Sequence, residues 1–350
     1  MALTSLRQIL DHAAEYGYGM PAFNITNSET LQAVLEAAKK TGSPAIVQVS
    51  QSARKYADDI FLAAMFEAAA KRYPEVPLCI HQDHGSSPSV CRDAIAIGCS
   101  SVMMDGSLRE DGKTPSDFAY NADVTRETVQ FAHARGVSVE GEIGVLGSLE
   151  TGGGEQEDGH GVEGVLSREE LLTDPEEAAR FVDATGVDAL AVAIGTSHGA
   201  YKFSRRPTGD LLALDVIAAI HARLPNTHLV MHGASTVPQE LQDQINAFGG
   251  NIPQTYGVPA EEIVKSIKHG VRKVNIDTDL RMAFTGAIRE NLARNPSSFD
   301  IRNLLKAASV NMSRLCQERF EQFGASGRAA SIKPISLDDM AARYREGSIR

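Results

Sequence analysis

Three segments of this 350-residue chain end in the same two residues, a histidine followed by a glycine. The pairs are His84-Gly85, His198-Gly199 and His232-Gly233, and each lies at the end of a mostly apolar run. Imidazole is a common neutral ligand for a metal, and three protein ligands leave the fourth position of a catalytic zinc open for substrate. A glycine beside each histidine lets a substrate approach the backbone closely. The repetition therefore predicts one metal site.

The segments that must hold such a site alternate between short β-branched runs and helical stretches. This alternation is typical of βαβ units, and eight strands predict an α/β fold, a (β/α)8 TIM barrel. In such barrels the loops at the C-terminal ends of the strands form the active site, and the three histidines fall there. The predicted strands are Pro21–Ile25, Ala45–Ser50, Leu78–Gln82, Ser101–Asp105, Ser138–Ile143, Ala189–Ile194, His228–His232 and Val271–Asp277.

Polar caps mark where the intervening helices begin. Ser28 precedes a helical run to Lys40, and Asp174-Pro175 precedes one to Thr185. We expect residues 1–350 to form a single barrel domain, with a C-terminal helical extension from about 298 to 350. The sequence assigns no role to the tail at 325–350. The segments beyond the eighth strand are predicted as a last barrel helix, Leu280–Ala293, and two appended helices, Asp300–Phe323 and Leu337–Arg345.

Composition excludes several classes of partner. A net charge of -11 argues against non-specific binding to nucleic acid or to an anionic membrane surface, and no apolar segment approaches the roughly 20 residues of a membrane span. The N-terminal residues 1–10 resemble the start of an amphipathic helix and lack the features of a signal peptide. The four cysteines form no CxxC pair, which favours free thiols in a reducing, cytoplasmic compartment.

Charged residues gather at the same strand ends. Asp83 precedes the first histidine, Asp105 closes the fourth predicted strand, Glu140 and Glu142 lie on the fifth, and 275–277 end the eighth. Because side chains alternate along a strand, adjacent Asp83 and His84 cannot both point inward while the strand stays regular. One of the two must already lie in the turn.

Two kinds of loop suggest further chemistry. The segment 144–172 is rich in glycine and acidic residues, which is typical either of an active-site lid that carries a general base or of a solvated acidic loop. The small residues at 233–235 and 275–278 offer backbone amides to a phosphate, and barrel phosphate sites favour the loops after the seventh and eighth strands.

Taken together, these motifs resemble class II fructose-bisphosphate aldolase, and the glycine-rich loop and long tail are most similar to its Calvin-cycle subtype. The resemblance covers the chain from the N-terminal helix to about Arg302. It is carried by His81–Gly85, Ser101–Asp105, Val139–Gly144, Glu157–Gly159, Gly195–Phe203, His232–Ser235 and Lys273–Asp279.

The resemblance implies reversible aldol cleavage of fructose 1,6-bisphosphate to dihydroxyacetone phosphate and glyceraldehyde 3-phosphate through a metal-stabilised enediolate, in glycolysis, gluconeogenesis and the Calvin cycle. It implies catalytic Zn²⁺ on His84, His198 and His232, with a second divalent metal position at Asp105 and Glu142. Asp83 would polarise or protonate the aldehyde oxygen. Glu157 would remove the carbon-bound proton of dihydroxyacetone phosphate, although this chain has Glu155-Gln156-Glu157 where many relatives have adjacent glutamates, so Glu155 stays an alternative.

The resemblance also implies substrate contacts and partners. A monovalent cation, K⁺ or Na⁺, would bind near the phosphate loops, and the arginine for the distal phosphate would come from a neighbouring subunit of a homodimer or homotetramer. The matching substrate-binding positions are Ser50, Gly199, Gly233, Ser235, Asn275, Asp277, Thr278 and Arg302.

Three alternatives remain open at this point. A tagatose-bisphosphate aldolase acts on a substrate that differs from fructose 1,6-bisphosphate only in the stereochemistry at one carbon, which the sequence does not reveal. A metal-dependent hydrolase on the same barrel typically has His-x-His on the first strand, and Ala22–Ile25 has none. A Schiff-base aldolase would need a buried lysine, for which Lys273 is the candidate, although a lysine near the start of a strand is the more ordinary interpretation.

Overall fold

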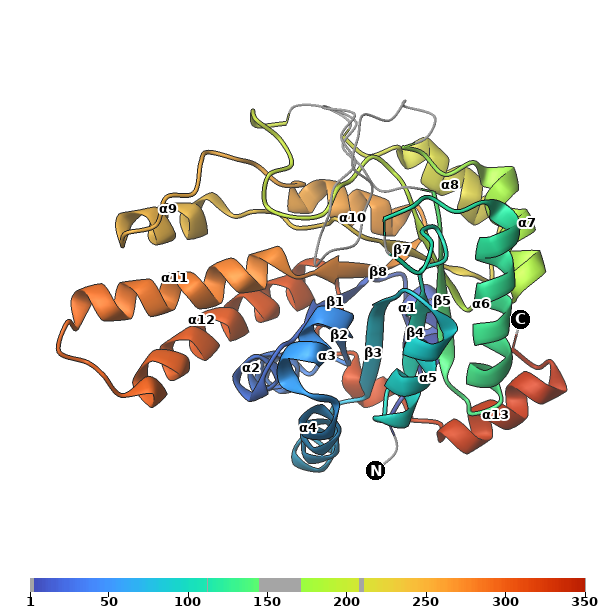
Figure 1. The fold of residues 1–350 in the computed structure, drawn as a ribbon, viewed down its shortest axis with the longest axis horizontal. Coiled ribbons are helices and arrows are strands. Elements are labelled where there is room, and N and C mark those ends of the chain that lie inside the picture. Colours follow the sequence, from blue (N-terminus) through green and yellow to red (C-terminus); the bar gives the residue numbers. More distant parts are fainter. Residues whose placement is uncertain (1–2, 112, 145–170, 208–210, 350) are drawn as a thin grey trace.

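Eight parallel strands close into a barrel in chain order, as predicted (Figure 1). The computed structural model describes residues 3–111, 113–144, 171–207 and 211–349. Each strand pairs with the next, and the first pairs with the eighth. The strands are β1 Met20–Asn24, β2 Ala45–Ser50, β3 Leu78–Gly85, β4 Ser101–Met104, β5 Ser138–Ile143, β6 Ala189–Val192, β7 His228–Met231 and β8 Val271–Ile276.

Helices connect the strands and cover the outside of the barrel. Asp174 caps α7 as predicted, by accepting a hydrogen bond from the amide of Glu177. The prediction of Ser28 as a cap is wrong, because the Asn27 carboxamide caps that helix and Ser28 is its first residue. The helices are α1 Leu6–Tyr16, α2 Ser28–Thr41, α3 Gln51–Ala57, α4 Asp59–Arg72, α5 Pro88–Ala96, α6 Phe118–His133, α7 Pro175–Thr185, α8 Leu214–Arg223, α9 Gln239–Ala247, α10 Ala260–Lys268, α11 Thr278–Arg294, α12 Ile301–Gln322 and α13 Leu337–Glu346.

The strands are buried almost throughout, because helices cover their outer faces and side chains fill the barrel. The interior layer is unusual in being polar. Gln48, His81, Glu140 and Lys273 are all fully buried, although they come from four different strands. Buried polar groups must find partners, so this layer predicts a hydrogen-bonded network below the active-site end.

Beyond the barrel, α11 and α12 form an antiparallel pair that extends away from it, with their connecting turn at the far end (Figure 1). The return of α12 brings Phe320 against Phe23 of β1, with ring centroids 5.2 Å apart. The chain then passes to the opposite end of the barrel, where α13 packs beside α6. No helix in the described part of the chain is long and apolar enough to cross a membrane.

Candidate metal centre and active site

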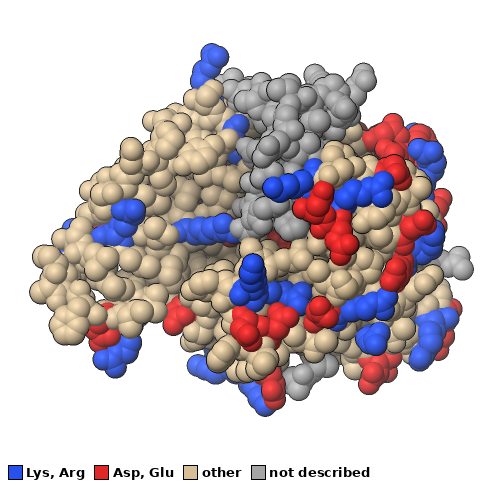
Figure 2. Space-filling model, viewed as in Figure 1, with Lys and Arg blue, Asp and Glu red and all other residues tan. Residues whose placement is uncertain are grey.

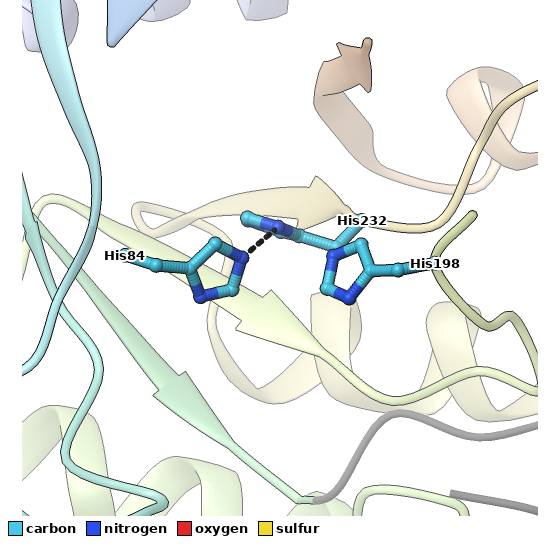
Figure 3. A group of neighbouring side chains, drawn as sticks. All are labelled: His84, His198 and His232. Carbon is cyan, nitrogen blue, oxygen red and sulfur yellow. Dashed lines mark hydrogen bonds between the residues drawn. The ribbon is translucent and has the colours of Figure 1, made fainter. Parts of the chain in front are cut away.

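The three histidines predicted as one site do meet at the C-terminal end of the barrel (Figure 3). The Nε2 atom of His84 lies 3.0 Å from Nδ1 of His232, and the ring of His198 lies 5.2 Å from the first and 5.7 Å from the second, measured between centroids. One ligand nitrogen from each ring falls within 4.8 Å of the others. Three convergent imidazole nitrogens are suited to a divalent metal.

An irregular strand solves the problem posed by adjacent Asp83 and His84. The pairing of β3 with β4 shifts register between Gln82 and Gly85, and His84 has a φ of 46° in the left-handed region. The strand therefore continues past both residues instead of ending before His84. Both side chains reach the barrel mouth, and the strained backbone of His84 lies where function is expected to concentrate strain.

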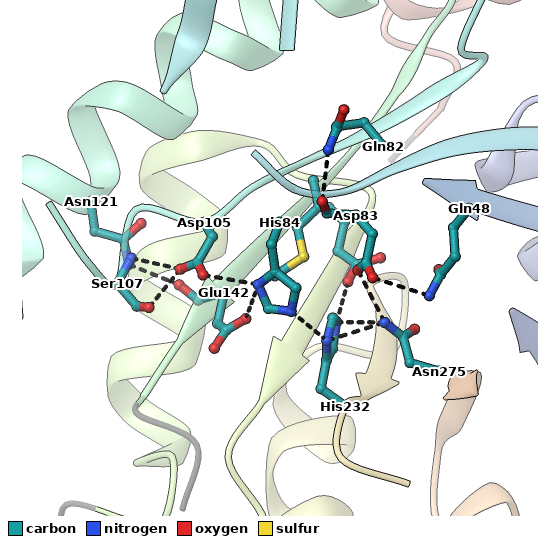
Figure 4. Close-up of polar contacts among 12 residues, drawn as sticks. Gln48, Gln82, Asp83, His84, Asp105, Ser107, Asn121, Glu142, His232 and Asn275 are labelled. Carbon is teal, nitrogen blue, oxygen red and sulfur yellow. Dashed lines mark hydrogen bonds and ion pairs between the residues drawn. The ribbon is translucent and has the colours of Figure 1, made fainter. Parts of the chain in front are cut away.

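Two carboxylates complete a second group of potential ligands around His84. Asp105 Oδ2 accepts a hydrogen bond from its Nδ1 at 3.0 Å, and Glu142 Oε2 lies 3.9 Å from the same nitrogen (Figure 4). One potential ligand atom from each of His84, Asp105 and Glu142 lies within 4.8 Å of the other two. Glu142 Oε2 is buried and has no hydrogen-bond partner among the described residues. An orphaned buried carboxylate oxygen beside an imidazole fits a cation ligand.

Electrostatics at this site depart strongly from ordinary values. Burial and then the charge of Asp105 raise the pKa of Glu142 well above its usual range. Burial opposes a charge on His84, but its hydrogen bond to Asp105 and the charge of Asp83 help raise its pKa to about 10. Such crowding of like charges favours binding of a cation between them.

Asp83 lies beside the histidines and is held by side-chain amides. It accepts a hydrogen bond from Asn24 at 2.9 Å. It also accepts hydrogen bonds from Gln48 at 3.3 Å and from Asn275 at 3.2 Å (Figure 4). Burial alone would raise the pKa of Asp83, but the positive charges of His84 and its neighbours lower it well below its usual value. The carboxylate is therefore kept ionised and fixed in direction.

The loops after β6, β7 and β8 place small residues around the same mouth. Gly199 and Gly233 have φ values of 83° and 63°, and a Cβ on Gly233 would lie 2.5 Å from the carbonyl oxygen of Ser197. The buried ammonium of Lys202 donates to the carbonyls of Ser197 and Gly233 and so joins the two loops. Thr278 opens the 17-residue helix α11, and the N-terminal end of a helix attracts anions.

Comparison with known proteins now decides the family. The family model described as fructose-bisphosphate aldolase class-II matches residues 4–328. The chain belongs to the class II fructose-bisphosphate aldolases. It is therefore an aldehyde-lyase of the metal-dependent class. The fructose-bisphosphate aldolase of Stutzerimonas stutzeri is 62% identical to this aldolase, and the alignment covers 100% of this chain and 99% of that relative. The fructose-bisphosphate aldolase of Nostoc sp. is 61% identical, and the alignment covers 100% of this chain and 97% of that relative. The crystal structure of the YdjI aldolase from Escherichia coli K12 has a TM-score of 0.71 at 27% identity, covering 93% of this chain and 99% of that one.

Not every residue predicted for the aldolase site is found beside His84, His198 and His232 in this single chain. Arg302 is in the first turn of α12, at the far end of the helical arm that α11, α12 and their connecting turn form (Figure 1). Its 87% exposed side chain pairs with Asp300 at 2.7 Å. Glu155 and Glu157 lie outside the described residues. Ser50 and Asp277 do lie together, along a cavity of about 310 Å³ at the barrel mouth.

Sequence reasoning missed three contributors to the site of this aldolase. Asn24 and Gln48 orient Asp83, and Lys202 joins two loops, yet none of them was assigned a role. Lys273, considered above only as a Schiff-base candidate or as a lysine near the start of a strand, is the third residue of β8 and is fully buried inside the barrel. Its phase predicts this inward direction, because Lys273 lies two residues before Asn275, on the same strand face.

Proposed function

We propose that the enzyme is a zinc-dependent aldolase that reversibly cleaves fructose 1,6-bisphosphate into dihydroxyacetone phosphate and glyceraldehyde 3-phosphate. The observation that supports it best is the convergence of His84, His198 and His232 next to the ionised carboxylate of Asp83. Three neutral nitrogen ligands that leave the fourth coordination position open are typical of catalytic zinc. The resemblance to the Calvin-cycle subtype supports a role in that cycle as well as in glycolysis and gluconeogenesis.

The donor set fits a metal in two ways. Three imidazoles would hold Zn²⁺, and the Asp105–Glu142 pair, with its orphaned oxygen, would hold a second divalent metal. The ion, when bound, would supply a Lewis acid that polarises the ketone of dihydroxyacetone phosphate. The three rings that would hold the ion meet at the C-terminal end of the barrel (Figure 3).

Asp83 would move the proton on the substrate oxygen. In cleavage, an ionised carboxylate can accept the proton of the C4 hydroxyl group as the carbon–carbon bond breaks. In condensation, the same carboxyl group returns that proton to the aldehyde oxygen. Its three amide donors would keep it aimed at that oxygen throughout. Glu157 is proposed as the base for the carbon-bound proton from the sequence resemblance alone.

The phosphate groups would bind at opposite sides of the mouth. Amides near Gly199 and Gly233, the Ser235 hydroxyl group and the start of α11 at Thr278 would hold the phosphate of dihydroxyacetone phosphate, with Asn275 and Asp277 beside it. Binding of K⁺ or Na⁺ near these loops is proposed from the sequence resemblance alone.

A second subunit would complete the distal phosphate site. In a single chain Arg302 is remote from the histidines, whereas an arm exchanged between subunits could deliver it. The arm carries large exposed apolar side chains, Phe299 at 96% and Val310 at 64%, which suit a subunit contact. On the face shown in Figure 2, charged side chains gather on the right, away from the left part of the view where α11 and α12 lie. We propose a homodimer or homotetramer that acts on small phosphorylated sugars in the cytoplasm.

Metal analysis together with cleavage assays tests this function. We expect one tightly bound zinc per chain, cleavage of fructose 1,6-bisphosphate in preference to tagatose 1,6-bisphosphate, and no adduct trapped by borohydride. Full activity after exhaustive chelation, or a trapped adduct, would instead favour lysine chemistry. The ion pair between Lys273 and Glu140 at 2.8 Å argues against that result, because a nucleophilic lysine must be neutral.

A further inference from the structure

Directly below the metal ligands, a buried polar chain crosses the inside of the barrel. Glu140 of β5 lies at its centre and contacts His232 at the end of β7, Lys273 of β8 and His81 of β3. All four side chains have no solvent exposure. The proposed function gives a role to His232 and none to the other three. Charged groups are rarely kept in a dry core unless they hold something in place.

The two oxygens of Glu140 have different partners. Oε1 lies 2.9 Å from Nε2 of His232, and Oε2 accepts a hydrogen bond from Nζ of Lys273 at 2.8 Å. His81 is a weaker neighbour, with its Nε2 atom 3.5 Å from Oε2 and its Nδ1 atom on the Ser101 hydroxyl group at 2.8 Å. The other nitrogen of His232, Nδ1, faces His84 and the metal site.

This arrangement determines which nitrogen of His232 can bind a metal. A neutral imidazole carries one proton, and only the nitrogen without it has a lone pair for a metal. An ionised glutamate can only accept hydrogen bonds, so it fixes the proton on Nε2. The lone pair is thereby left on Nδ1, which points at the site. A carboxylate behind a metal-binding histidine commonly fixes its tautomer and ring orientation in this way.

Lys273 supplies the charge that lets Glu140 stay ionised without water. A single buried carboxylate would be costly, whereas a hydrogen-bonded ion pair offsets much of that cost. Lys273 also restricts Glu140, because its ammonium can only donate and therefore claims one carboxylate oxygen. The other oxygen is then committed to His232.

We propose that Glu140 and Lys273 are a positioning pair that selects the metal-binding tautomer and orientation of His232. The proposal rests on the proposed metal site. It predicts that the identity of the atom facing Nε2 of His232, acceptor or donor, controls metal affinity even though neither residue touches the metal.

The substitution Glu140→Gln tests this with almost no change in shape. Lys273 would claim the oxygen of the new amide, which turns its NH2 group toward His232 and forces the proton onto Nδ1. We expect zinc affinity, measured by competition with a chelator, to fall by about 10- to 100-fold. Cobalt loaded in place of zinc should show a changed visible absorption spectrum, which reports ligand geometry and would not respond to a general loss of stability.

A pair of double variants provides the matched control. Glu140→Gln/Lys273→Met frees the amide to turn its oxygen back toward Nε2 of His232, so zinc affinity should recover by about tenfold over Glu140→Gln. Glu140→Leu/Lys273→Met also removes both charges but offers no acceptor, and it should bind zinc about tenfold more weakly than the first double variant. The two doubles remain comparable even if the single variant does not fold.

His81→Gln serves as the structural control, because His81 touches Glu140 without touching His232. It should leave zinc affinity within about threefold of the starting enzyme, well below the effect of losing a histidine-orienting partner. Equal affinities in the two doubles, or an equal loss in His81→Gln and Glu140→Gln, would overturn the positioning role. If the unaltered enzyme itself bound no zinc, the proposed function would fail instead, so the two failures are distinguishable.

Discussion

Both ends of the barrel contain histidines among carboxylates, but the two clusters are organised differently. At the C-terminal end, His84, His198 and His232 point their ring nitrogens at one another. At the N-terminal end, His133 and His228 each have a carboxylate of their own, Asp188 at 2.9 Å and Asp11 at 2.7 Å. Convergence marks the first cluster as a binding site, whereas pairing marks the second as a structural contact.

The N-terminal cluster uses its donors and acceptors among the protein's own groups. Asp188 accepts hydrogen bonds from the amide of Val139 at 2.8 Å and the hydroxyl group of Tyr344 at 2.8 Å, in addition to His133. The ring of Tyr344 stacks on that of His133 with centroids 3.7 Å apart. Helix α13 is thereby fastened under the barrel. At the other end, by contrast, Glu142 keeps an oxygen without a hydrogen-bond partner among the described residues.

The largest predicted difference between the clusters is in metal binding. His198→Ala should lose a ligand and with it the zinc and nearly all aldolase activity. His133→Ala, a histidine substitution of the same kind at the opposite end, should keep stoichiometric zinc. Metal content after gel filtration and the rate of fructose 1,6-bisphosphate cleavage measure both effects. Zinc retained in the first variant, or lost in the second, would contradict the assignment of metal binding to the C-terminal cluster.

Removal of the proposed lid base should have the next largest effect. Glu157→Ala should retain zinc and bound dihydroxyacetone phosphate but slow exchange of its carbon-bound proton by roughly 100-fold or more, the scale of a missing general base. Exchange is followed by loss of isotope into solvent. Glu155→Ala is the control, and if it stops the exchange while Glu157→Ala does not, the base is two residues earlier.

Substitution of Asp83 should separate proton exchange from carbon–carbon bond cleavage. Asp83→Ala should keep zinc and still exchange the proton of dihydroxyacetone phosphate, because neither needs this carboxylate. Cleavage and formation of the carbon–carbon bond should fall by roughly 100-fold. Measuring both rates on one preparation checks this, and loss of zinc would show that Asp83 supports the metal ligands instead.

The pH dependence of zinc affinity should also distinguish the C-terminal histidine cluster from the N-terminal one. The raised pKa of His84, about 10, means that in the metal-free enzyme at neutral pH both nitrogens of this ring carry a proton. Zinc must displace one of these protons, so its affinity should rise by up to about tenfold per pH unit below pH 10. Chelator competition at pH 7 and pH 8 tests the sign. His228 is different, because burial lowers its pKa and leaves it neutral in its structural contact.

The sequence allowed the scaffold and the convergence of the three histidines to be predicted because both repeat. The βα alternation occurs eight times and the His-Gly pair three times, and barrel geometry then brings the strand ends together. The boundaries were less certain, since the true cap Asn27 and the predicted Ser28 are adjacent polar residues that cap helices equally well.

What the sequence did not reveal depends on contacts between distant strands. Glu140 and Lys273 are 133 residues apart, and nothing local indicates that they meet inside the barrel. Asn24 and Gln48 likewise look like ordinary strand residues until Asp83 is placed between them. The contacts of Asp188 likewise join four separate segments, which contribute His133, Val139, Asp188 and Tyr344, so the fastening of the C-terminal tail could not be predicted.

The smallest predicted effect concerns that tail. Tyr344→Phe removes one hydrogen bond to Asp188 but keeps the ring stacked on His133, so the free energy of unfolding should fall by about 1–2 kcal/mol. Zinc affinity and cleavage rate should not change, because Asp188 directly precedes β6 whereas His198 lies beyond the opposite end of that strand. Urea denaturation monitored by circular dichroism measures the first, and the metal and activity assays measure the second. If Tyr344→Phe weakened zinc binding, the two ends of the barrel would be coupled through β6, and the N-terminal cluster could no longer be regarded as purely structural.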